Sequence, residues 1–430
     1  MEKVFRAERM DEIFEHHAQV QYTRELLFSD LVNLLSLVVC GIHPSINAAY
    51  KAKAKEVNVT RNAIYAKLTG VEPTVSAALL RESTAELSKL VGQMGGGQPA
   101  LLENYQVRIL DGSALAATER RLKVLRSVAA APLPGKSLVV LDPAVRLAVD
   151  LFPCEDGHAQ ERRLFEQVLA TIEPQQLWIA DRNMCTLGFL AGIAQREAAF
   201  AIREHQNLPW EAVSDLQPAG QVEAGEVLEQ TIEIQHCGER LRLRRVVLRL
   251  AKPTRHGDAE MVVLTNLPAM AADAVRVVRL YRERWQIEGL FLTVTQNFEG
   301  EIDTLAYPKA ALLSFTLALM AYNLLATVRA ALASVHGVGK IEAALSNFYV
   351  VEELQGIYRG MMIAIPPVHW QAFEDLSLLD LAQLLKDLAA QVELKRFLKQ
   401  PRKKKKKKKP LVVDSKRPHV STAKLLEQKK

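Results

Sequence analysis

Three side chains with complementary chemistry stand at helical spacing in segment 281–288. If Tyr-Arg-Glu-Arg-Trp-Gln-Ile-Glu is helical, Tyr281, Arg284 and Glu288 occupy positions i, i+3 and i+7 and share one face. That face offers an aromatic ring, a guanidinium fork that suits phosphate, and a carboxylate. The segment therefore predicts a site for a phosphate-bearing substrate.

Two aspartates upstream each follow an apolar run that predicts a strand. Asp111 follows Val107–Leu110, and Asp181 follows Leu177–Ala180. Taken alone, each has an ordinary structural explanation, as a turn residue or as a helix N-cap. With Glu288 they predict a cluster of hard oxygen ligands for Mg²⁺, with Mn²⁺ as a substitute, and hence phosphodiester chemistry.

These residues resemble the signature of the bacterial cut-and-paste DDE transposases of the insertion-sequence-4 group. That signature is Tyr-x2-Arg-x3-Glu-x6-Lys, preceded by two strand-end aspartates. Tyr281, Arg284 and Glu288 fit it, whereas the seventh residue after Glu288 is Thr295 rather than lysine. The resemblance covers roughly residues 100–330. Because threonine supplies no positive charge, this departure puts the positioning of a DNA strand in doubt.

The resemblance implies a ribonuclease-H-like catalytic core with Asp111, Asp181 and Glu288 as catalytic and metal-binding residues. It also implies a DNA transposase that binds the terminal inverted repeats of its own element, works as a homodimer on DNA, cuts the ends and joins them to target DNA. Two alternatives stay open. One is a catalytically impaired relic that only binds DNA, which Thr295 favours, and the other is a ribonuclease-H-like nuclease without transposition.

Several side chains near the predicted acidic cluster are candidate DNA contacts. Arg284 is expected to clamp a phosphate, with an ion pair to Glu288 as the alternative. Tyr281 and Trp285 can stack on bases, although packing in the core is the alternative for both. Arg203, at the end of a predicted strand, is a further candidate, and its alternative is an ion pair with Glu204.

Residues 1–91 are predicted to form a helical N-terminal DNA-binding domain. A helix is expected within Ser45–Lys55, and Thr60 suits the N-cap of a second helix over 61–68. Two short helices around a tight turn predict either a helix-turn-helix or a plain helical hairpin. In the first case Arg61, Asn62 and Lys67 can face DNA. Residues 92–99 are rich in glycine and predict a linker.

The remaining chain predicts an α/β fold: a ribonuclease-H-like mixed sheet with flanking helices over 100–204 and 271–335, interrupted by a mostly antiparallel β insertion over 205–270. Residues 336–398 are expected to be helical. Residues 399–430, with seven consecutive lysines, predict a disordered basic tail. The expected strands are 106–110, 122–128, 137–141, 177–180, 198–202, 227–236, 240–250 and 260–266, and the expected helices in the core are 158–172, 187–197, 272–295 and a long apolar one to about 333.

Charge is unevenly distributed along the 430 residues. The chain carries +6 overall, but residues 395–430 alone carry +14, so the other 394 residues carry −8. A basic surface on the folded body must therefore come from local clustering. The four cysteines are scattered without a Cys-x2-Cys pair, which favours a reducing compartment. The resemblance to transposases implies a cytoplasmic location in association with the nucleoid. The uncharged run 310–328 approaches membrane-span length but contains polar residues, so a buried core helix is expected instead of a membrane segment.

Overall fold

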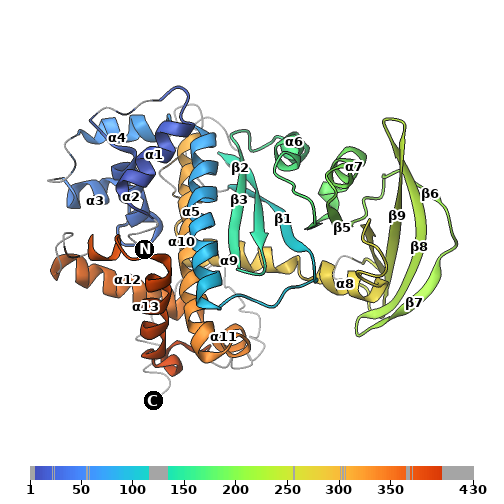
Figure 1. Cartoon of the computed structure of the whole chain (residues 1–430). Helices are drawn as coiled ribbons and strands as arrows, with labels where there is room; N and C mark the ends of the chain where they lie inside the picture. Colours follow the sequence, from blue (N-terminus) through green and yellow to red (C-terminus); the bar gives the residue numbers. More distant parts are fainter. Residues whose placement is uncertain are drawn as a thin grey trace, which may run out of the picture.

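The chain is described by a computed structural model. It covers residues 5–399 except 22, 24, 55–56, 58, 116–133, 255–256, 301, 303–304, 306, 365–368 and 370. Figure 1 shows helices gathered on one side of a central sheet and a β-rich extension on the other. The predicted mixed α/β architecture is confirmed.

The N-terminal part is helical, as predicted. Ser45 and Thr60 cap the two short helices through their hydroxyls, which accept from the backbone N–H groups of Ala48 and Ala63. The last helix runs through Gly92, where a linker was expected to begin, and ends at the left-handed Gly95. The helices are α1 (Ala7–His17), α2 (Phe28–Val39), α3 (Ile46–Ala52), α4 (Arg61–Leu68) and α5 (Pro73–Met94).

Five strands form the core of the sheet in the order β3-β2-β1-β4-β5. Strand β2 runs antiparallel to both β3 and β1, whereas β4 runs parallel to β1 and β5 runs parallel to β4. This is the ribonuclease-H-like arrangement that the resemblance implied. The strands are β1 (Gln106–Leu115), β2 (Gly135–Asp142), β3 (Leu147–Cys154), β4 (Gln176–Ala180) and β5 (Ala199–Arg203).

Three expectations for this core need correction or fall outside the structure. The first strand does not end at Leu110, because pairing with β2 carries it on to Leu115. Strand β3 was not expected, and the helix over 158–172 is reduced to a short 3-10 turn and α6 (Phe165–Leu169). The strand expected at 122–128 lies outside the described residues.

The β insertion is antiparallel, as predicted, but it is continuous with the core sheet. Its last strand pairs with β5, so all ten strands form one sheet. The turn at Cys237-Gly238 has positive φ at both residues, 49° and 86°, which matches the right-handed twist of the long hairpin. The strands are β6 (Glu211–Ala212), β7 (Gln217–Val222), β8 (Gly225–His236), β9 (Glu239–Leu250) and β10 (Glu260–Thr265).

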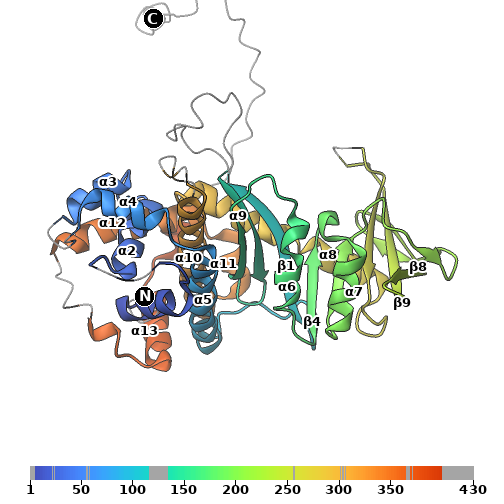
Figure 2. The same ribbon diagram turned by 90° about the horizontal axis from the view of Figure 1, so that it is seen from above.

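Alternate side chains of the core strands face two different layers. Leu110, Val140 and Trp178 pack with α6 and with α7 (Leu187–Gln195) on one side. Ile109 and Ile179 pack on the other side with α5, α8 (Ala274–Arg282), α9 (Trp285–Asn297) and α10 (Pro308–His336). Figure 2 shows the sheet between these two layers.

The long helix α10 is the central core helix. Among the described residues it is the one helix long and apolar enough to span a membrane, but 83% of its most apolar window is buried inside the protein. The expectation of a buried core helix is confirmed. The C-terminal part is helical too, with α11 (Val338–Ala344), α12 (Asn347–Ala364) and α13 (Leu378–Ala390), and residues 400–430 lie outside the described residues.

Candidate functional site

The register of the two parallel core strands brings the two aspartates to the same end of the sheet. Leu110 of β1 is paired with Ala180 of β4, so Asp111 and Asp181 follow side by side. Asp111 accepts the Gly112 N–H through Oδ1 at 2.8 Å, and Asp181 accepts the Asn183 N–H at 2.8 Å. Each aspartate thus fills a local structural role as well, as a strand residue and as an N-cap.

Glu288 approaches this pair from α9. The helix expected over 272–295 is in fact two helices, because α8 ends at Arg282 and α9 begins at Trp285, with Glu283 and Arg284 in the turn between them. Arg284 is the residue that joins the two sides. Its Nη1 donates to Asp111 Oδ2 and its Nη2 donates to Glu288 Oε1, both at 2.6 Å. We refer to Asp111, Asp181 and Glu288, together with Arg284, as the acidic site.

The pKa of Asp111 is set by burial and by opposing charges in the acidic site. Burial raises the pKa of Asp111 to about 6, and the charges of Asp181 and Glu288 add to the rise. Arg284 and the Gly112 N–H act in the opposite direction. Asp181 and Glu288 are therefore close enough to Asp111 for their charges to act on it, and one guanidinium partly compensates.

Tyr281 and Trp285 flank Arg284 but have different surroundings. The Tyr281 side chain is only 5% exposed and packs in the core, and burial raises the pKa of its hydroxyl to about 12. Trp285 is 66% exposed, and its ring centroid lies 5.8 Å from the Arg284 guanidinium. Core packing thus applies to Tyr281, whereas Trp285 is free to meet a partner.

Residues 136–324 match the family model of the transposase DDE domain. The matched region includes Asp181 and Glu288 and begins after Asp111. No curated protein matches the chain. Among solved structures, the chain is similar to the piggyBac transposase synaptic complex with hairpin DNA, with 10% identity, coverage of 91% of this chain and 82% of that chain, and a TM-score of 0.39.

A fourth carboxylate, Glu161, borders the acidic site and was not among the expected catalytic residues. A Cβ on Gly112 would collide with the Glu161 carboxylate, which shows how closely the side chain covers this part of β1. Burial and the charge of Asp181 raise the pKa of Glu161, while Lys136 lowers it. The sequence signal was the spacing His158-x2-Glu161, of which only Glu161 reaches the site, because His158 is exposed.

The other expected DNA contacts lie on two elements, β5 and α4. Arg203 is ion-paired with Asp258 at 2.9 Å, not with Glu204. Arg61 and Asn62 are exposed on α4, which lies on the far side of α5 and α10 from the sheet (Figure 1). Lys67, on the same helix, packs over the Phe14 ring. In the described part of the chain, these four side chains therefore lie outside the acidic site.

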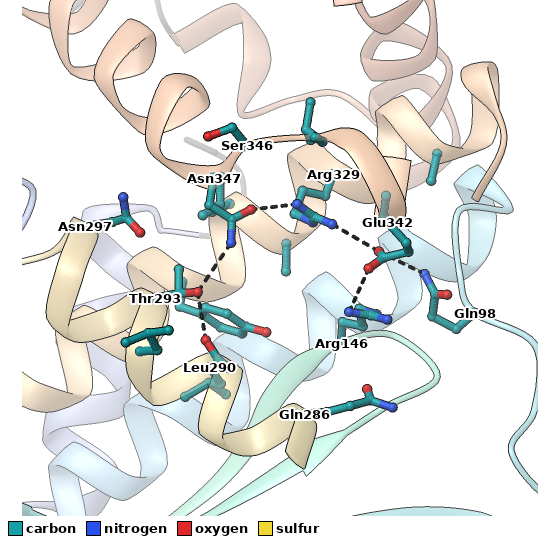
Figure 3. A pocket seen from close by; sticks show the side chains of 18 of the residues that line it. Gln98, Arg146, Gln286, Leu290, Thr293, Asn297, Arg329, Glu342, Ser346 and Asn347 are labelled. Atoms are coloured by element: carbon teal, nitrogen blue, oxygen red, sulfur yellow. Dashed lines mark hydrogen bonds and ion pairs between the residues drawn. The ribbon is translucent and has the colours of Figure 1, made fainter. Parts of the chain in front are cut away.

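A separate cavity of about 770 Å³ lies along a different face of α9. Figure 3 shows the polar network that crosses it. Glu342 is paired with Arg146 at 2.8 Å and with Arg329 at 3.2 Å, and Arg329 also donates to Asn347 at 2.6 Å. Asn347 in turn donates to Thr293 of α9 at 3.3 Å. We call Arg146, Arg329 and Glu342 the arginine cluster.

The acidic site has the donor chemistry of a magnesium site without its arrangement. Carboxylate oxygens are the ligands that Mg²⁺ prefers. Nevertheless, within the part of the chain that the structure describes, no three His, Cys, Asp or Glu side chains are grouped so as to hold a metal ion. The guanidinium of Arg284 stands between Asp111 and Glu288 instead.

Proposed function

We propose that this chain is a DNA transposase. It would bind the terminal inverted repeats of its own element, cut the DNA at the element ends and join the 3′-hydroxyls to target DNA. The observation that carries the proposal is the convergence of Asp111, Asp181 and Glu288 around Arg284, largely within a region that matches a transposase DDE domain. The protein is expected in the cytoplasm, in association with nucleoid DNA.

Asp111, Asp181 and Glu288 are the proposed catalytic residues, and they would hold Mg²⁺, for which Mn²⁺ can substitute. When bound, such ions supply activation of the attacking hydroxyl and stabilisation of the leaving oxygen. The side chains fit this group in kind, since all three are carboxylates, and burial, followed by the charges of Asp181 and Glu288, raises the pKa of Asp111. Arg284 must release Asp111 and Glu288 before the three carboxylates can surround a metal ion.

Arg284 and Trp285 are proposed to hold the DNA strand at the acidic site, with Tyr281 in support. Arg284 offers a planar fork for a backbone phosphate, and its buried Nε–H has no hydrogen-bond partner in the described part of the chain. The exposed Trp285 ring offers a stacking surface for a base. Tyr281 is buried beneath Arg284, so its expected role is to support the guanidinium more than to touch DNA.

Further DNA contacts are proposed away from the acidic site. Arg61 and Asn62 on the exposed side of α4 are candidates for sequence recognition by the N-terminal helices. Arg203 would reach DNA only after release from Asp258. A homodimer on DNA is part of the proposal, because two element ends have to be brought together.

The test is metal-dependent nicking of a labelled duplex that carries the terminal repeat flanking the gene. Wild type should cut at the element end with Mg²⁺ or Mn²⁺, and Glu288→Ala should bind the duplex without cutting. Glu283→Ala is the matched control, since this carboxylate lies in the same turn and accepts its hydrogen bond from Gln286. If Glu288→Ala cuts as well as wild type, the assignment of the third carboxylate is wrong.

A DNA-binding relic is the second candidate, and one observation favours it. Thr295 stands where the resembling family has lysine, and its hydroxyl donates to the carbonyl oxygens of Phe291 and Leu292 in its own helix. That hydroxyl is thus engaged, and the position carries no positive charge. Wild type that binds the end duplex but never nicks it would identify a relic, and Thr295→Lys would then be the variant to test for restored cleavage.

A further inference from the structure

Arg284 occupies the space between two proposed metal ligands. It donates to Asp111 and to Glu288 at 2.6 Å each, and its side chain is only 13% exposed. Its partners are more accessible, at 18% for Asp111 and 39% for Glu288. Hydrogen bonds between a guanidinium and a carboxylate are stronger than those between neutral groups. The acidic site is therefore already filled by a cation that belongs to the chain.

We propose that Arg284 is a resident cation that keeps divalent metal out of the acidic site until DNA phosphate draws the guanidinium away. This inference rests on the proposed function and adds a condition to it: the site is complete for chemistry only when DNA is bound. Arg284 thereby becomes a specificity-determining residue, because it prevents metal from being loaded on protein without substrate.

The charge balance explains why neither a metal ion alone nor a DNA phosphate alone should displace Arg284 easily. Removing Arg284 from Asp111 would leave a largely buried carboxylate without its counter-ion, which is costly. Moving the guanidinium without a new anion would leave it unpaired as well. When a phosphate takes the guanidinium and a metal ion takes the carboxylates, both charges are satisfied together. Metal and DNA should thus bind cooperatively, each strengthening the other by the same factor.

The backbone around Arg284 permits such an exchange. Arg284 lies in the turn between α8 and α9, where no helix extends across it. Among the residues that the structure describes, its Nε–H has no hydrogen-bond partner, so at least one donor of the guanidinium remains unused in the present arrangement. The exposed Trp285 ring, 5.8 Å from the guanidinium, offers a surface along which the side chain can turn outward.

The test measures Mn²⁺ binding by the full-length protein from the electron paramagnetic resonance signal of free Mn²⁺, at mildly alkaline pH. A random-sequence duplex serves as the phosphate probe, because backbone contacts do not depend on sequence. Duplex alone provides the blank. We expect wild type to bind Mn²⁺ weakly without DNA and at least about tenfold more tightly with it. Arg284→Gln should bind Mn²⁺ tightly even without DNA.

Arg282→Gln is the matched control, because it removes the same charge from an exposed position two residues away. Its Mn²⁺ affinity should stay at the wild-type value. Arg284→Lys covers the case in which Arg284→Gln does not fold, which circular dichroism reveals. A lysine cannot span both carboxylates, so DNA-free Mn²⁺ affinity should rise here too, by less.

Two results would overturn the inference: wild type that binds Mn²⁺ equally well with and without DNA, or Arg284 variants that bind it no better than Arg282→Gln. Failure of the proposed function has a different signature. If no form of the protein binds DNA, the transposase proposal fails, while a gain in DNA-free Mn²⁺ affinity in the Arg284 variants would still support the resident cation.

Discussion

Helix α9 separates two clusters built from the same side-chain types but with opposite balance. In the acidic site one arginine faces three carboxylates, whereas in the arginine cluster two arginines share Glu342. The formal charge is thus −2 for the acidic site and +1 for the arginine cluster. The arginine cluster also bonds to Asn347 and, through it, to Thr293. Its charges are nearly balanced by its own members, as expected of a structural network, whereas the acidic site keeps an excess that a cation can relieve.

The sharpest way to test this comparison is to remove a carboxylate from the acidic site. Asp111→Asn should reduce nicking on the order of 10⁴-fold, as for essential catalytic groups. Its effect on stability should be small, because relief from burial and repulsion offsets the lost pair with Arg284. End-labelled duplex cleavage and urea denaturation measure the two effects. A destabilised protein with normal cleavage per folded molecule would make Asp111 structural.

The pH dependence of cleavage should come from the acidic site. Because the pKa of Asp111 is raised to about 6, its carboxylate form is lost as pH falls through that value. Nicking should therefore be constant above about pH 7 and fall about tenfold per pH unit below 6. A pH–rate profile at Mn²⁺ and DNA concentrations well below saturation tests this, because rates in that range report the groups of the free protein. A profile that stays flat down to pH values near 4 would contradict the assignment.

Removing the shared carboxylate of the arginine cluster should lower stability and leave cleavage unchanged. Glu342→Gln leaves Arg146 and Arg329 without their counter-ion, and it should lower the free energy of unfolding by about 2 kcal/mol, after allowance for partial exposure. Cleavage per folded molecule should be unchanged. Urea denaturation beside Glu103→Gln, at an exposed carboxylate, is the appropriate comparison. An undiminished stability would show that the cluster is not structural.

The smallest expected effect concerns the exposed side chains on the two faces of α9. Trp285→Ala should weaken DNA binding by about 1 kcal/mol through lost base stacking, without loss of stability. Leu292→Ala is the control, since this residue is 54% exposed on the side of the cavity. Fluorescence anisotropy with a single-stranded end measures the difference. Equal affinities for both variants would remove Trp285 from the DNA surface.

Much of the fold could be predicted because its signals are local. Alternating apolar and polar residues predicted β8 and β9, and the turn at Cys237-Gly238 follows from the same pattern. Capping chemistry predicted the start of α4 at Thr60, and helix-forming residues predicted a helix at α3. The extension of β1 to Leu115 could not be predicted, because it depends on pairing with β2. The break between α8 and α9 could not be predicted either, because no glycine or proline lies between them.

By itself, the sequence determined which charged groups are present and the order in which they occur, and from these the acidic residues Asp111, Asp181 and Glu288 could be chosen. The tertiary structure decided which charges meet. Arg284 pairs with Asp111 across 173 positions of sequence, and the register of β1 with β4 brings Asp181 alongside. Local spacing cannot specify such contacts, because they arise from strand pairing and helix packing between distant segments.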